Sequence, residues 1–178
     1  DPVEVRRQRL GARRLDIGRL RTVHADHDRR PPRPRIAAAI GDDIRADLPM
    51  TVHNCKPGLY ADESVRLEPD GRLYFPAYRL CATVAGLNGR ALAGAALVPR
   101  PCGERSAFME ADALQRFVHR PDGKVELRGS GLCLTAGAES DRTFEATHRW
   151  RTLFVARCNH TDPKLSRWEF VIPKERMR

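Results

Sequence analysis

One pattern of turns and cysteines occurs twice in this chain at nearly constant spacing. Each copy begins with an Asp-Gly turn, and the two turns start 52 residues apart, at Asp70 and Asp122. Each turn is followed by two cysteines, which are Cys81 and Cys102 in one copy and Cys133 and Cys158 in the other. A period of roughly fifty residues indicates a chain assembled from units of similar structure. Unequal cysteine spacing is compatible with this, because a surface loop absorbs a few extra residues.

A third and weaker copy precedes these two. The segment from Asp16 to Leu20 stands about one step before the Asp70 turn, and Cys55 takes the place of the second cysteine. Val65 follows Cys55 by ten residues, as Trp168 follows Cys158. No residue near Asp28 supplies the first cysteine. We therefore expect a basic arm, three units and a short tail, at residues 1–13, 14–66, 67–118, 119–172 and 174–178, with the repeat region ending near residue 173.

The segments between the turns are typical of β-strands. Residues 72–75, 124–127 and 153–156 have strand length and alternating or apolar content. The 13 Pro and 13 Gly among 178 residues favour many short strands over a few long helices. The best helix candidate is Met109 to Phe117, where a loop turn is the alternative. The sequence predicts an all-β fold.

The five cysteines indicate an oxidising compartment. Within the repeats we expect Cys81 to pair with Cys102 and Cys133 with Cys158, each pair closing a short loop. Such disulfides are typical of exported proteins, secreted or periplasmic, and the start at Asp1 without a leader fits a mature exported chain. Cys55 is left either as a buried thiol or as a tether to another chain.

The third unit resembles a known family of repeats. Its opening at residues 129–134, Gly-Ser-Gly-Leu-Cys-Leu, its second cysteine and the Trp168 that follows are similar to the ricin B-type lectin repeat. Three such repeats form a β-trefoil, and the family's Gln-x-Trp signature corresponds here to Trp168, Phe117 and Val65. The resemblance therefore implies a β-trefoil of three repeats with one disulfide inside each well-preserved repeat.

The same resemblance argues against the family's sugar chemistry. Ricin-type sites use an Asp two residues after the first cysteine, where this chain has Thr83 and Thr135. An aromatic residue two positions before the second cysteine stacks on the sugar, and here Arg100 and Ala156 stand there. No unit keeps the acceptor and the platform together. The comparison implies a degenerate lectin repeat.

The positive charge is concentrated near the N-terminus. The chain has a net charge of +9, and residues 1–35 hold eleven Arg against five acidic residues. The Pro-rich run at 29–35 has an extended character, and its guanidinium groups suit an acidic partner or anionic surface; they belong to Arg29, Arg30, Arg33 and Arg35. A solvated basic segment is the alternative. Nucleic acid is disfavoured, because aromatic residues do not alternate with this basic run.

Catalytic and metal-binding patterns are weak. The polar segment at 24–28 carries two His and two Asp, which could chelate a metal, but its polar surroundings favour a solvated segment. No nucleophile motif, phosphate-binding loop or cofactor motif occurs, and no apolar run is long enough to span a membrane. Trp150 lies in an insertion at 143–151, which is either a binding loop or part of the core packing.

These observations predict a non-catalytic, exported binding or assembly subunit without cofactor or metal. We expect a protein partner, with a glycan or anionic surface as further options. One alternative is a working lectin with rearranged sites, for which the candidate residues are Thr135, Trp150, Asn159, His160 and Arg100. Another is the cell-binding subunit of a bacterial toxin, since degenerate ricin-like subunits of about this size occur in toxins such as the cytolethal distending toxin.

Overall fold

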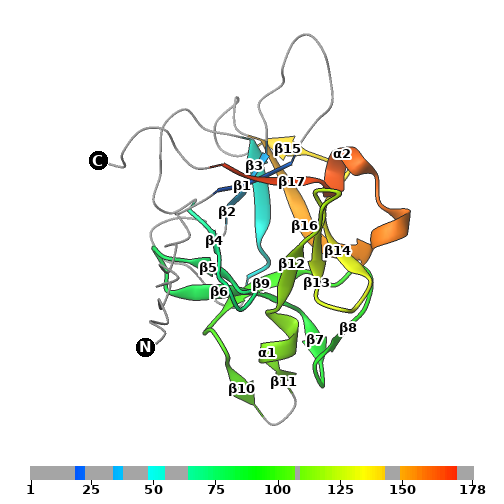
Figure 1. Ribbon diagram of the computed structural model, residues 1–178. Coiled ribbons are helices and arrows are strands. Elements are labelled where there is room, and N and C mark those ends of the chain that lie inside the picture. Colours follow the sequence, from blue (N-terminus) through cyan, green and yellow to red (C-terminus); the bar gives the residue numbers. More distant parts are fainter. Residues whose placement is uncertain are drawn as a thin grey trace, which may run out of the picture.

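The computed structural model of this chain consists almost entirely of short β-strands joined by turns (Figure 1). The structure describes residues 19–22, 34–37, 48–54, 64–106, 109–142 and 149–171. Within these ranges the two α-helices have four residues each, so strands carry the architecture. The predicted all-β fold class is confirmed.

One antiparallel sheet contains the first complete cysteine motif. Its strands follow the order β4-β5-β6-β9, with bounds Arg66–Leu67, Leu73–Phe75, Leu80–Val84 and Leu97–Arg100. The strand predicted at 72–75 is therefore present as β5. A separate hairpin of β7 (Gly86–Leu87) and β8 (Arg90–Ala91) connects β6 to β9.

The second cysteine motif lies in strands of the same order and register. These strands are β12 (Phe117–His119), β13 (Val125–Leu127), β14 (Leu132–Ala136) and β16 (Arg149–Arg157), with β15 (Asp141–Arg142) added beside β16. Cys81 lies opposite Arg100 in one sheet, and Cys133 lies opposite Ala156 in the other. The sequence period therefore corresponds to a structural repeat of four strands, and the strands predicted at 124–127 and 153–156 are present.

A third set of four strands joins the two ends of the chain. The C-terminal strand β17 pairs with β1, β1 with β2, and β2 with β3; the bounds are Trp168–Val171, Arg19–Thr22, Pro34–Ala37 and Thr51–Asn54. The register is also the same: Phe170 in β17 lies opposite Leu20 in β1, as His119 in β12 lies opposite Val125 in β13. Figure 1 shows β17 beside β1, although most of the chain separates them in sequence.

The Asp-Gly turns bring an aromatic residue of the next segment into the interior. Gly71 has a φ of +97°, which glycine adopts without strain, and its carbonyl accepts a hydrogen bond from the Phe117 amide at 2.7 Å. A Cβ at Gly71 would lie 2.7 Å from the Phe117 carbonyl oxygen. The equivalent bond joins the Trp168 amide to the Gly123 carbonyl at 2.7 Å. Both turns therefore require glycine.

The three positions of the Gln-x-Trp signature meet in one core. Val65, Phe117 and Trp168 are at most 1% exposed, and the Trp168 indole N–H donates to the Leu134 carbonyl at 3.0 Å. The inner strands, with the residue just before β3, add six buried residues, two from each set: Met50, Val52, Leu97, Pro99, Leu153 and Val155. Burial of each large apolar side chain contributes about 1.5–3 kcal/mol, so this shared core is the main source of stability.

The helix predicted over 109–117 is mostly absent. Only α1 (Ala111–Leu114) is helical, and it follows the small hairpin of β10 (Arg105–Ser106) and β11 (Met109–Glu110). The chain leaves the helix at Gln115 because Phe117 must reach the Gly71 carbonyl and start β12. In the matching place of the next set, the 3-10 helix η2 (Cys158–His160) precedes α2 (Pro163–Ser166).

Candidate functional site

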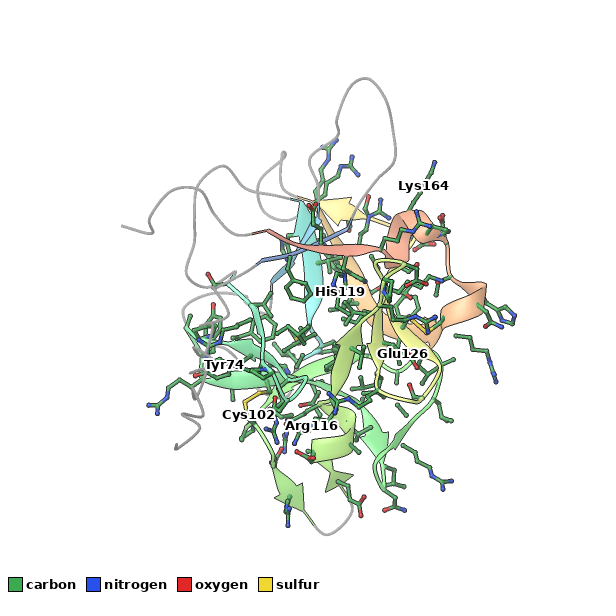
Figure 2. All side chains as sticks on the ribbon, viewed as in Figure 1. Tyr74, Cys102, Arg116, His119, Glu126 and Lys164 are labelled. Carbon is green, nitrogen blue, oxygen red and sulfur yellow. A yellow bond between two sulfur atoms is a disulfide. The ribbon has the colours of Figure 1, made fainter. Side chains whose placement is uncertain are left out.

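Two disulfides close the cysteine motifs as predicted. Cys81 is bonded to Cys102 and Cys133 to Cys158, with Cα–Cα distances of 5.1 Å and 4.9 Å. Each disulfide joins the third strand of a set, β6 or β14, to the segment that follows the fourth strand of the same set. Figure 2 shows the bond at Cys102. The disulfides fix the segments that carry the sugar contacts in the ricin B-type repeat.

The threonines at the acceptor positions are buried and turned inward. Thr83 and Thr135 are 1% and 6% exposed, and each hydroxyl donates to the carbonyl of the cysteine two residues earlier, at 3.3 Å and 3.0 Å. A buried hydroxyl that is satisfied by its own strand offers little to a ligand in solvent. These two positions serve the local structure.

The polar residue of the signature is also part of the interior. Gln115 is fully buried, and its amide nitrogen donates to the Thr83 hydroxyl at 2.8 Å and to the Pro101 carbonyl at 2.9 Å. Its amide oxygen accepts from the Gly103 N–H at 2.7 Å. Gln115 therefore connects the start of β12 to the segment around Cys102. In the next set Ser166 takes this place and donates to the Asp162 carbonyl at 2.8 Å.

The platform positions hold no exposed aromatic residue. Arg100 forms a two-point ion pair with Glu104, with both nitrogen–oxygen distances at 2.6 Å. Hydrogen bonding to this carboxylate raises the pKa of Arg100, while burial acts in the opposite direction. The guanidinium of Arg100 is thus already engaged by an acid of its own chain. In the next set the half-buried Ala156 occupies the position.

The register also accounts for the missing cysteine of the first unit. Arg35 lies in β2 opposite His53, just as Cys81 lies opposite Arg100 and Cys133 opposite Ala156. Arg35 therefore takes the place of the first cysteine. Its backbone pairs with β1 and β3 on both sides, so Arg35 is part of the sheet, and its contact with an acidic partner stays a prediction.

Several predicted features lie outside the described residues. These are Cys55, the arginines Arg29, Arg30 and Arg33, the polar segment 24–28, the arm at 1–13, the insertion at 143–148 and the tail at 174–178. Within the described ranges, no three potential metal ligands lie together. The helices of those ranges are too short and too polar to cross a bilayer.

The residues of the alternative lectin site are spread along β16. Trp150 lies opposite His53 near one end of the strand, and Thr135 lies opposite Phe154. Asn159 and His160 are exposed in η2, beyond the other end. Trp150 and η2 are separated by roughly 25 Å of extended chain, so these residues form no single cluster.

A surface pocket is present near the turn between β13 and β14. It has a volume of about 450 Å³, and its lining includes Arg120, Lys124, Gly131, Arg157 and Asn159. The Lys124 ammonium donates to the Cys158 carbonyl, and the Glu126 carboxylate accepts from Arg120 at 2.8 Å and from the Gly131 N–H at 3.1 Å. Figure 2 shows Glu126 on the side of the molecule away from Cys102. The small residues at 129–131 are the signal of this pocket in the sequence, where they indicate only a turn.

A denser charge network lies between the two complete sets. Asp112 in α1 accepts hydrogen bonds from Arg116, at 2.8 Å for the closest contact, and from Arg72, which also binds Asp70. The hydrogen bond from Arg116 lowers the pKa of Asp112; burial opposes this shift, and the charge of Arg72 reinforces it. The cations of this network are thus matched by acids.

Comparison with solved structures finds a similar β fold in other proteins. An agglutinin from Abrus precatorius matches 86% of this chain with a TM-score of 0.61 and 16% identity. The structure of an mdaA-1 domain matches 80% of this chain and 85% of its own length, with a TM-score of 0.56 and 21% identity. The chain spans about half of the agglutinin, 47% of its length. At these identities the likeness concerns the fold alone. No protein-family model and no curated protein sequence matches the chain.

Proposed function

We propose that this protein is a non-catalytic, exported binding or assembly subunit. Its fold is a β-trefoil of three units, and its surface contacts a protein partner or an anionic surface in place of the neutral sugar that the ricin B-type repeat binds. The burial of both acceptor threonines, Thr83 and Thr135, is the observation that carries this proposal.

The trefoil assignment is supported by three sets of four strands with matching registers. In each set the first strand begins at or after a buried signature residue, which is Val65, Phe117 or Trp168. The set that contains β17, β1, β2 and β3 draws on both ends of the chain. The sets of four strands therefore do not coincide with the sequence units. The first strand of each set belongs to the end of the preceding unit, after that unit's second cysteine.

The loss of sugar chemistry is supported by what replaced it. The Thr83 hydroxyl accepts from Gln115, and Arg100 is paired with Glu104. Both positions are committed to contacts within the chain. A neutral sugar would have to break these contacts and leave buried polar groups unpaired, at a cost of about 1–3 kcal/mol for each group.

A role in contact with another molecule is supported by the exposed surface. The β7–β8 hairpin and the residue after it expose Leu87 and Leu92 by 60% and 81%. The net charge of +9 favours an acidic partner. The two disulfides fit export, because such bonds persist in oxidising compartments.

The competing function is carbohydrate binding by a working lectin, and the likeness to an agglutinin favours it. A glycan array separates the two functions. We expect no binding of neutral galactosides by the wild-type chain and no change with Thr135→Ala. Binding of a neutral galactoside that Thr135→Ala weakens at least tenfold would establish the lectin and overturn the proposal. A role as the cell-binding subunit of a toxin would appear as binding to intact cells together with an enzyme chain.

A further inference from the structure

The pocket beside the β13–β14 turn exists because small residues replace large ones. Ser130 and Gly131 stand where the preceding set has Tyr78 and Arg79. The Ser130 amide donates to the Leu127 carbonyl as the Tyr78 amide donates to the Phe75 carbonyl, whereas the Gly131 amide donates to the Glu126 carboxylate. Arg79 and Gly131 both have positive φ, 58° and 70°. The two turns therefore share a positive φ at this position, while the later turn has a second one at Gly129, 71°, where the preceding set has Ala77.

The charges that line this pocket are unevenly compensated. Arg120 is paired with Glu126 at 2.8 Å and with Asp122 at 3.5 Å. Lys124 and Arg157 form no ion pair with any acid among the described residues. The Lys124 ammonium uses one of its three donors for the Cys158 carbonyl, which leaves two. The pocket therefore presents two cations whose charge is not matched by a carboxylate.

The preceding set shows how such a cation is neutralised when no ligand is needed. Arg72 corresponds to Lys124, and it binds Asp70 and Asp112. Counting back from the signature residues Phe117 and Trp168, Pro163 takes the place of Asp112. A proline cannot pair with a cation, so Lys124 lacks a counterpart of Asp112, while Asp122 keeps the place of Asp70 and lies 3.5 Å from Arg120.

The pocket is separate from the position that binds sugar in ricin B-type repeats. Side chains alternate along a strand, so Leu132 and Arg157, which lie opposite each other, face away from Cys133 and Ala156. The acceptor and platform positions belong to the Cys133 side, whereas the pocket lies on the side of Arg157. A ligand here would not depend on the lost lectin residues.

We propose that this pocket binds the sulfate or carboxylate group of an acidic carbohydrate through Lys124 and Arg157. The inference rests on the proposed binding role and adds a site and a ligand class to it. A guanidinium and an ammonium bind such oxyanions through short, charge-assisted hydrogen bonds. The volume of about 450 Å³ is in the range of small-molecule sites and exceeds what one oxyanion fills. The Asn159 amide is available for the sugar hydroxyls.

The test is a titration of the full chain, followed by amide chemical shifts and by calorimetry. The probes are a sulfated heparin hexasaccharide, a hyaluronan hexasaccharide that carries carboxylates only, neutral maltohexaose and inorganic sulfate. We expect the two acidic hexasaccharides to shift the amides of Gly131, Leu132 and Asn159, and maltohexaose to shift none of them. Arg157→Gln and Lys124→Gln should each weaken acidic binding roughly tenfold or more.

Two further variants separate the pocket from general charge effects. Arg142→Gln removes one exposed charge at the other end of β16, roughly 25 Å along the strand, and should weaken binding less than twofold. Ser130→Tyr copies the preceding set, fills the pocket and should abolish binding without a loss of charge. Each variant must have the same unfolding midpoint as the wild-type chain. If Arg157→Gln or Lys124→Gln unfolds, the other of these two variants is used.

Three results would overturn the inference. The first is an absence of acidic hexasaccharide binding, or binding that Arg157→Gln and Arg142→Gln weaken equally. The second is equal affinity for maltohexaose. The third is inorganic sulfate binding as tightly as the hexasaccharides, which would assign the pocket to a small free anion. None of these results bears on a protein partner, because isolation of a complex tests the proposed function separately.

Discussion

Replacing Gln115 by methionine should destabilise the protein by about 2–3 kcal/mol. The change keeps the side-chain size but removes three hydrogen bonds, of 2.7, 2.8 and 2.9 Å, from a fully buried position. A typical hydrogen bond contributes about 1 kcal/mol, which sets the upper value. Water can reach the exposed Pro101 and the half-buried Gly103 and replace part of these bonds, which lowers the expected loss of stability. The buried Thr83 hydroxyl is left without its donor.

The assay is urea unfolding under non-reducing conditions, followed by near-UV circular dichroism. A loss of this size lowers the melting temperature by roughly 4–12 °C in a domain of this length. Ser166→Ala is the matched control, because Ser166 occupies the same place in the next set and makes one side-chain bond. It should cost about 1 kcal/mol. Equal effects of the two variants, or a Gln115→Met variant that loses glycan binding at unchanged stability, would refute a structural role for this glutamine.

Three other perturbations have defined outcomes. Removal of the Cys133–Cys158 bond by two serines should cost about 3 kcal/mol, and so should removal of the other disulfide, because the separations of 25 and 21 residues are similar; thermal melts that differ widely would contradict this. Trp168→Phe should cost about 2 kcal/mol in urea unfolding, since the indole hydrogen bond and part of the buried ring are lost, and a neutral result would place the ring outside the core. The folded-state pKa of Asp112 lies below its unfolded value, so its stabilising effect is present above pH of about 4 and is lost as the pH falls through the folded pKa. Asp112→Asn should therefore be less stable than wild type at pH 7 and converge with it in acid, and a constant difference across this range would exclude the carboxylate as the cause.

The repeated part of the fold could be predicted from the sequence because its signals are local. Asp-Gly turns specify the positive φ of Gly71 and Gly123, and two similar cysteine spacings, of 21 and 25 residues, specify two similar loops. These features do not depend on the rest of the chain. The strands between them and both disulfides are present where the pattern placed them.

The closure of the chain could not be predicted in the same way. β17 pairs with β1 across nearly the whole sequence, and a pattern of alternating residues does not name such a distant partner. The role of Arg35 has the same origin, because only the register of β2 with β3 shows that it stands in the place of a cysteine. The short α1 was overestimated, because apolar spacing alone does not show that Phe117 must leave the helix.

The pocket could not be predicted because it depends on the absence of large side chains in the β13–β14 turn. Ser130 and Gly131 are good turn residues, and the sequence gives no sign that their small size leaves a cavity between three separate segments. The cations of this cavity come from the turn before β13 and from the end of β16. Only the folded chain brings Lys124 and Arg157 together.

Under the proposed function this β fold binds a partner in place of a neutral sugar. The most direct measurement is a gentle, non-reducing purification from the native source, with mass spectrometry of whatever remains bound. We expect a stoichiometric protein partner that stays associated when neutral sugars are added. A lone monomer, or a complex that galactose dissolves, would contradict this expectation.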